Sequence, residues 1–483
     1  MRTDKTITTK TVFNSLGWKL FERIMTQGVN LVVQIVLARI LLPKDFGDLA
    51  IISALVNYLG LFVQSGLSTA IIQKKELDEM DVSTLLTASL FIALIVYVLL
   101  FILSPSIASF YSSNVLIWPL RVLSLNLFFN SVCSIQTAIY SRGMNFKKLF
   151  FRSVIAVPIS GTVGILMALN NMGIWALVCQ SLLNSVIVVI FMSCDKGMVV
   201  KLRFSLKRAK KLYSFSIKIL LTSMITGLHD MIRTIVIGKR YLPSELAYYD
   251  KAYTYSGYIT QITNQSISSV LLPTFSRSQS DFHQIKIIAR KSIGLSSFVM
   301  FPILVGFASV AKPFVLLILT DKWAKSIPLL MIFCFLRIPG CLNSVDKQVF
   351  YALGKSGINL IYEIIFCGMN IITLFFTVSH GVTYIAIGAT IVEYLGCVVI
   401  FVISKSVYDY SLKERFTDLI KPALSTFVMA VVIWCSGLLM QNMVLCLIIK
   451  IALGFFSYLL MEWLIKDENF MYLLGVMKRR RKK

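Results

Sequence analysis

Long apolar segments separated by short polar stretches recur along the whole chain. Hydropathy predicts about 14 of them, each close to the roughly 20 residues with which an α-helix crosses ~30 Å of hydrocarbon. The predicted spans are 17–40, 46–66, 83–104, 115–139, 149–169, 173–193, 213–237, 247–272, 294–311, 327–353, 358–378, 381–404, 421–440 and 443–465. The pattern therefore predicts an all-α protein that crosses a membrane many times.

The first of these spans is unusually polar on one face. Its polar residues recur every three or four positions, so they share one side of a helix: Lys19, Glu22, Arg23, Thr26, Gln27, Asn30 and Gln34. A charge at the bilayer centre costs about 2.5–3.5 kcal/mol on insertion scales, so this face is expected to line a bundle interior or a wet cavity. A hydrogen-bonded seam between helices is the alternative. The charges of Glu22 and Arg23 exceed what packing needs, which favours the cavity.

The two halves of the chain repeat short motifs in the same order. Leu42–Gly47 (LPKDFG) follows the first span, and Leu242–Ala247 (LPSELA) follows the seventh, about 200 residues later. Asn171–Gly173 before the sixth span similarly resembles Ser379–Gly381 before the twelfth. Six spans in each half give both halves the same orientation. The repeat thus predicts two six-helix lobes related by a pseudo-twofold axis along the membrane normal, plus two C-terminal helices.

This repeat also predicts where the parts of the chain begin and end. They are an N-lobe at 1–195, a basic cytoplasmic linker at 196–212, a C-lobe at 213–404, the last two spans within 405–466, and a basic cytoplasmic tail at 467–483.

The seventh span carries a polar stripe like that of the first span. Its members are Ser214, Lys218, Thr222, Thr226, His229, Asp230 and Arg233. Each half therefore contributes one net-basic helix, and two lobes that face a shared cationic cleft are typical of alternating-access transporters. Arg121 and Lys347 are further candidates for that cavity. Neighbouring opposite charges, Glu22 with Arg23 and Asp230 with Arg233, are expected to form internal pairs.

Basic residues are unevenly distributed between the loops that connect successive spans. The 483 residues contain 48 Lys and Arg against 23 Asp and Glu, a net charge of +25. The basic residues concentrate on alternate loops and at both ends, which predicts that both termini are cytoplasmic. In a membrane protein this excess is explained by topology and does not indicate binding to nucleic acid.

The sequence contains no clear metal-binding or catalytic motif. The nine cysteines form no CxxC pair and the three histidines lie far apart, so neither a metal site nor a cofactor is predicted. There is no P-loop lysine motif, and the short outer loops hold no catalytic constellation. The chain is therefore not expected to be an enzyme.

Several short motifs resemble one known family. They are Leu37–Gly47, Gln64–Leu67, Ile71–Lys75, Arg121–Ser124, Gly173–Val178, Tyr248–Ala252 and Lys322–Trp323. In this order they resemble the polysaccharide transporter family, the oligosaccharide-lipid flippases of the multidrug/oligosaccharidyl-lipid/polysaccharide exporter (MOP) superfamily. The similarity is greatest to the group like colanic-acid exporters, and it extends over nearly the whole chain.

The resemblance implies a function and a location. A member would move an undecaprenyl-diphosphate-linked oligosaccharide across the bacterial cytoplasmic (inner) membrane by alternating access, for O-antigen or exopolysaccharide synthesis. Its partners would be that lipid-linked sugar, the lipid bilayer and other assembly proteins such as a polymerase. Arg23 and Arg39 align with substrate contacts of the family, and the stripes add Lys218, Arg233, Gln27, Asn30 and Gln34. Glu22, Asp230 and His229 are candidates for coupling or for internal pairing.

Two other functions compete with this interpretation. A cation-coupled drug antiporter of the same superfamily would favour acidic or aromatic residues around a cationic cargo, whereas both stripes are net basic. A membrane glycan polymerase would need a sizeable outward loop with catalytic residues, which the predicted spans do not leave.

Overall fold

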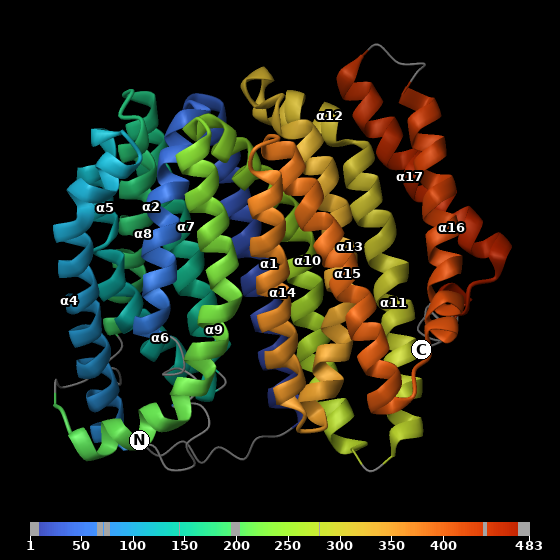
Figure 1. Ribbon diagram of the computed structural model, residues 1–483, viewed down its shortest axis with the longest axis horizontal. Coiled ribbons are helices and arrows are strands. Elements are labelled where there is room, and N and C mark those ends of the chain that lie inside the picture. The colour runs from blue at the N-terminus through green and yellow to red at the C-terminus, as the bar shows by residue number, and fades with distance from the viewer. Residues whose placement is uncertain are drawn as a thin grey trace. The chain divides into compact units, whose positions relative to one another are not determined.

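The computed structural model describes residues 9–64, 71, 78–143, 145–194, 203–279, 281–437 and 442–471, and within these residues the regular structure is entirely helical. Figure 1 shows the long helices of each part running side by side. Their bounds are α1 Thr9–Ile40, α2 Pro43–Gln64, α4 Glu79–Phe110, α5 Ile117–Leu123, α6 Asn126–Arg142, α7 Phe146–Leu169, α8 Ile174–Ser193, α9 Leu206–Arg240, α10 Pro243–Arg277, α11 Phe282–Ser309, α12 Ala311–Phe314, α13 Ser326–Ala352, α14 Ser356–Thr377, α15 Val382–Tyr408, α16 Leu412–Gly437 and α17 Met443–Ile465.

Within the described residues, each predicted span coincides with helical structure. Among the described residues, 12 helical segments are long and apolar enough to cross a membrane. One of these, Asn114–Arg142, is a broken span that contains α5 and α6. The long helices α1 and α10 are not among these 12. The protein is thus an all-helical, multi-pass membrane protein with about 12 candidate spans.

The chain divides into two compact units, residues 1–247 and 248–483. This division differs from the predicted lobe boundary at 196–212, because α9 packs against α2 and α4 of the first unit. Gly227 and Gly238 of α9 allow this close packing: a Cβ at Gly227 would lie 3.1 Å from Leu61, and one at Gly238 would lie 3.0 Å from Ile51. The six-helix partition of the lobes stays a prediction.

In the first unit, the polar helix α1 packs mainly against α7. A Cβ at Gly161 would lie 2.5 Å from Val33, so only glycine lets the two backbones approach this closely. At the other end of the contact, the ring of Phe150 lies 5.5 Å from that of Trp18 and 5.1 Å from that of Phe21. These contacts fix which face of α1 points away from α7.

The repeated motifs have matching local structure. The amide of Leu41 donates to the carbonyl of Leu37 where α1 ends, and Tyr241 donates to Ile237 where α9 ends, both at 2.9 Å. Pro43 and Pro243 then begin the next helices, at the position where a missing N–H costs no helical hydrogen bond. Gly173 and Gly381 precede α8 and α15 with φ of 53° and 120°, which glycine adopts without strain.

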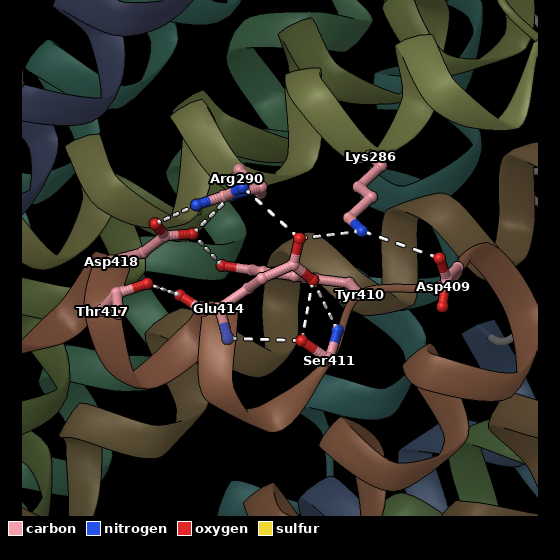
Figure 2. Close-up of polar contacts among 8 residues, drawn as sticks. All are labelled: Lys286, Arg290, Asp409, Tyr410, Ser411, Glu414, Thr417 and Asp418. Atoms are coloured by element: carbon pink, nitrogen blue, oxygen red, sulfur yellow. Dashed lines mark hydrogen bonds and ion pairs between the residues drawn. The ribbon is translucent and has the colours of Figure 1, made fainter.

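In the second unit, a network of ion pairs ties the start of α16 to α11 (Figure 2). The guanidinium of Arg290 donates to both carboxylate oxygens of Asp418, at 2.7 and 2.8 Å. Lys286 Nζ lies 2.9 Å from Glu414 Oε1, and Tyr410 donates its hydroxyl to Asp418 at 2.7 Å. The start of α16 is therefore joined to α11 by specific polar contacts.

Removing this network is expected to loosen α16. Arg290→Gln breaks a bidentate, charge-assisted contact, so we expect a loss of about 1–3 kcal/mol in stability that shrinks at high salt. Thermal unfolding of the purified protein at low and high ionic strength measures it. Lys291→Gln is the matched control, because Lys291 is the exposed neighbour on the same helix. Equal melting temperatures for both variants would contradict this prediction.

Candidate functional site

The polar stripe of α1 forms on a continuous helix, as the spacing predicts. Glu22, Arg23, Gln27, Asn30 and Gln34 are all half-buried. The Nε atom of Arg23 and the hydroxyl of Thr26, one turn away, are buried without a hydrogen-bond partner among the described residues. A buried donor left unpaired costs about 1–3 kcal/mol, so this stretch of α1 has unused capacity to bind an anion.

Glu22 has a different partner from the one expected. The hydroxyl of Ser153 in α7 donates to Glu22 Oε1 at 3.1 Å, and within the described chain Glu22 forms no ion pair with Arg23. Consecutive residues of a helix project in different directions, which explains why the predicted pair does not form. Glu22 therefore joins α1 to α7 and leaves Arg23 un-neutralised by its neighbour.

His229, Asp230 and Arg233 of α9 form a cluster. Arg233 Nη2 lies 2.8 Å from Asp230 Oδ1, so the predicted internal pair is present. His229 Nε2 lies 3.5 Å from the same oxygen and 3.4 Å from Arg233 Nη1. The Arg233 side chain is only 10% exposed, whereas that of Asp230 is 47% exposed. The cluster thus presents a carboxylate backed by an arginine. The side chain of Lys218 lies outside the described residues.

The candidate cations lie at separate levels along their helices. Arg39 is exposed in the last turn of α1, where a cation is stabilised by the helix dipole. At about 1.5 Å rise per residue, it lies about 24 Å along the axis from Arg23. The same arithmetic separates positions 218 and 233 of α9 by about 22 Å. One diphosphate is therefore too small to bridge either pair, and Arg23 and Arg39 cannot act as a single clamp.

Two half-buried cations were not found from the sequence. Arg152 of α7 donates from Nη1 to Thr137 Oγ1 at 2.8 Å and contacts Met192 Sδ at 3.1 Å. Arg337 of α13 donates to the carbonyl of Tyr253 at 2.9 Å and lies 4.0 Å over its ring. Both lie inside predicted spans, Arg152 in 149–169 and Arg337 in 327–353, and a cation within an apolar span is the signal by which they could have been found.

The two further cavity candidates have local partners. Arg121 donates from Nε to Ser104 Oγ at 2.8 Å and stacks 4.0 Å over the Phe101 ring. Lys347 Nζ lies 2.6 Å from Glu363 Oε1, between α13 and α14. Their charges are thus engaged within their own units. Over the described residues, no group of three His, Cys, Asp or Glu side chains has a geometry that could hold a metal ion.

Comparison with known proteins identifies the family. The model of the polysaccharide biosynthesis protein family matches residues 36–328, more than half of the chain. The chain belongs to this family. The motifs that pointed to it from the sequence lie within or beside this range.

Three relatives are proteins of polysaccharide biosynthesis, and one of them is named as a transport protein. The chain is 26% identical to the succinoglycan biosynthesis transport protein ExoT of Rhizobium meliloti, over 67% of this chain and 66% of that protein. It is 24% identical to the lipopolysaccharide biosynthesis protein WzxC of Escherichia coli, over 69% and 67% of the two chains. It is 23% identical to the teichuronic acid biosynthesis protein TuaB of Bacillus subtilis, over 83% and 84%. The protein is accordingly a membrane transport protein of polysaccharide biosynthesis and not an enzyme.

Solved structures show the same fold. The lipid II flippase MurJ in an inward closed conformation superposes with a TM-score of 0.75 at 15% identity, over 94% of this chain and 98% of MurJ. An inward-facing multidrug resistance transporter of the MATE family superposes with a TM-score of 0.61, over 80% and 98%. The fold is therefore that of the MOP superfamily. At this identity it does not distinguish a lipid flippase from a drug transporter.

Proposed function

We propose that this protein is a flippase for lipid-linked oligosaccharides. Its cargo would be an undecaprenyl-diphosphate-linked repeat unit, moved across the bacterial cytoplasmic membrane for O-antigen or exopolysaccharide synthesis. The observation that carries the proposal is the polar face of α1, where Arg23 has a buried, unpaired guanidinium nitrogen beside half-buried amides. Membership of a family with polysaccharide transport proteins supports it.

Each candidate residue has a proposed role that follows from its side-chain chemistry. Arg23 would hold phosphate oxygens, because a guanidinium donates charge-assisted hydrogen bonds to them. Gln27, Asn30 and Gln34, on the same face of α1, offer donors and acceptors that suit sugar hydroxyls. The Asp230–Arg233–His229 cluster is proposed to take part in coupling, since its carboxylate is half-exposed and lies 3.5 Å from an imidazole nitrogen that can carry a proton. Arg39 and Lys218 would contact the cargo at other stages of transport.

The finer architecture is also proposed. About 14 spans would form two six-helix lobes with a pseudo-twofold axis along the membrane normal, and alternating access would occur between them. The matching ends of α1 and α9 support this repeat. An experimental structure tests it: residues 15–193 and 211–404 are expected to superpose, and an axis in the membrane plane would contradict the proposal.

Charge predicts the orientation of the chain. A reporter inserted within 195–211 is expected to be cytoplasmic, and one at Asn170 external, because the basic loops stay inside. Paired fusions of alkaline phosphatase and green fluorescent protein measure this. Reporters that indicate the same side for both positions would overturn the proposed topology, including the cytoplasmic location of both termini.

The proposed function is tested by loss of the protein. A deletion strain is expected to accumulate lipid-diphosphate-linked repeat units on the inner leaflet and to lose surface polysaccharide, and the wild-type chain should restore both. Unchanged lipid-linked intermediates, together with increased sensitivity to cationic drugs, would instead assign the protein as a drug antiporter of the same superfamily.

A further inference from the structure

A glutamate is enclosed where α17 packs against α16 and α11 in the second unit. Glu462 lies in the last turn of α17 and is 0% exposed. Neither of its carboxylate oxygens has a hydrogen-bond partner among the residues that the structure describes. Carboxylates in protein interiors are ordinarily paired or hydrogen-bonded, because an isolated buried charge loses its solvation without compensation. The carboxyl group of Glu462 therefore needs either a ligand or a neutral form.

Two hydroxyl groups face this carboxyl group, one from α16 and one from α17 itself. Tyr458 lies one turn before Glu462 and donates its proton to the carbonyl of Phe298 in α11 at 2.7 Å. A phenol has one proton, so the Tyr458 oxygen presents lone pairs to Glu462. Ser425 of α16 is 0% exposed, and its hydroxyl has no hydrogen-bond partner in the described part of the chain. Acceptors around Glu462 thus outnumber donors, and one proton on the carboxyl group corrects this imbalance.

The segment that follows α17 covers the site. Asp467 is 3% exposed and accepts hydrogen bonds from the amides of Asn469 and Phe470, at 2.8 and 3.3 Å. This turn packs on α11: a Cβ at Gly294 would lie 3.1 Å from the side-chain amide of Asn469, and the Phe470 ring lies 6.4 Å from that of Phe298. The carboxyl group is therefore shielded from solvent by a folded turn as well as by the helices.

The nearby charges also favour a neutral carboxyl group. The negative charge of Asp467 acts on Glu462, and two adjacent carboxylates resist ionising together. Lys421 of α16 is half-buried and acts in the opposite sense, but in the described chain it forms no hydrogen bond with Glu462. The cations and the histidine of α11 and α12 are exposed or are held by carboxylates of α16: His283, Lys286, Arg290, Lys291 and Lys312.

We infer that Glu462 is a proton-binding site, a neutral carboxyl group that shares its proton with the hydroxyl groups of Ser425 and Tyr458. When the proton leaves, the carboxylate has no compensation inside the helix contact, so the end of α17 must open toward water or toward Lys421. The packing of α17 on α11 and α16 is thereby linked to proton binding. The site involves none of the residues of the polar stripes on α1 and α9, and it does not depend on the proposed cargo.

Infrared difference spectroscopy of the full-length protein detects this proton directly. The spectrum of the wild type minus that of Glu462→Gln at neutral pH is expected to contain the carbonyl stretch of a protonated carboxylic acid, which an amide lacks. Glu468→Gln is the matched control, because Glu468 is exposed just beyond α17, and its difference spectrum should contain the bands of an ionised carboxylate instead. Carboxylate bands without an acid band in the Glu462 difference spectrum would overturn the site.

Stability against pH measures the link between the proton and folding. An unfolded glutamate releases its proton above about pH 4.3, whereas the folded protein keeps it, so the folded state binds one proton more. Stability then falls as the pH rises. The folding equilibrium constant of the wild type is expected to fall by up to about tenfold more per pH unit than that of Glu462→Gln. Chemical denaturation of both proteins over a series of pH values measures this difference.

The same variants distinguish a proton from the other ways to compensate the carboxyl group. Glu462→Gln resembles the protonated acid in shape and charge, so it is expected to fold and to melt at least as high as the wild type at neutral pH. Equal pH slopes for the two proteins would show that no proton is bound. A Glu462→Gln protein that is unstable, and that Lys421→Gln restores, would identify an ion pair instead. Sodium ions that raise the melting temperature of the wild type but not of Glu462→Gln would make the ligand a metal cation.

Discussion

Replacing Arg415 by methionine is expected to prevent stable folding of the second unit. Arg415 and Asp346 are 1% and 0% exposed, and the guanidinium donates to both carboxylate oxygens, at 2.6 and 3.0 Å. Asp346 also accepts hydrogen bonds from Ser404 and Tyr408 of α15. The pair thus joins α13, α15 and α16. Removing one partner leaves a buried charge uncompensated, at a cost of about 3–5 kcal/mol.

Protein level in the membrane and melting temperature after detergent extraction measure this effect. Asp346→Asn should be similarly damaging, because it leaves the guanidinium without its carboxylate. The double variant Arg415→Met/Asp346→Leu should recover much of the loss, since it removes both charges and keeps the volume apolar. Lys413→Met is the control, an exposed cation in the same turn. Arg415→Met protein that melts like this control would show that the pair contributes nothing.

The helices and the stripes could be predicted because their signals are local. Hydropathy located all the long helices, and the spacing of Arg23, Gln27 and Asn30 placed them on one face of α1. The motif at Leu42–Gly47 recurred at Leu242–Ala247 and gave the same helix–turn–helix connection. Sequence periodicity determines these features, because they depend on residues within a few turns of one another.

The partners of the charges could not be predicted, because they come from distant helices. Arg415 lies between the predicted spans 381–404 and 421–440, yet its carboxylate partner is 69 residues away in α13. Glu22 was expected to pair with Arg23 but accepts a hydrogen bond from Ser153, 131 residues away. Positive-inside counting treats each Lys and Arg alike, so it cannot separate a solvated charge from a buried one. Only the packing of α7 on α1 and of α16 on α13 and α15 distinguishes them.

Replacing Arg23 by alanine is expected to abolish export of surface polysaccharide while the protein level in the membrane stays unchanged. Its buried Nε has no partner among the described residues, so its removal strands no carboxylate and creates little instability. If the guanidinium binds a diphosphate, a charge-assisted and bidentate contact is lost. Arg23→Lys should retain part of the activity, because an ammonium keeps the charge but lacks the planar fork. Surface polysaccharide, measured against immunoblots of membrane fractions, tests both variants.

Ser153→Ala separates binding from packing at the same helix pair. It removes the hydrogen bond to Glu22 and should lower the free energy of unfolding by about 1 kcal/mol. The melting temperature should fall slightly, and export should not be lost. The opposite interpretation is that Arg23 serves only to balance the charge of Glu22. In that case the double variant Glu22→Gln/Arg23→Gln removes both charges together, so neither is left unbalanced, and the protein should export normally. Normal export by this double variant would exclude Arg23 as a contact of the cargo, whereas continued loss of export in a stable protein would leave the diphosphate as its partner.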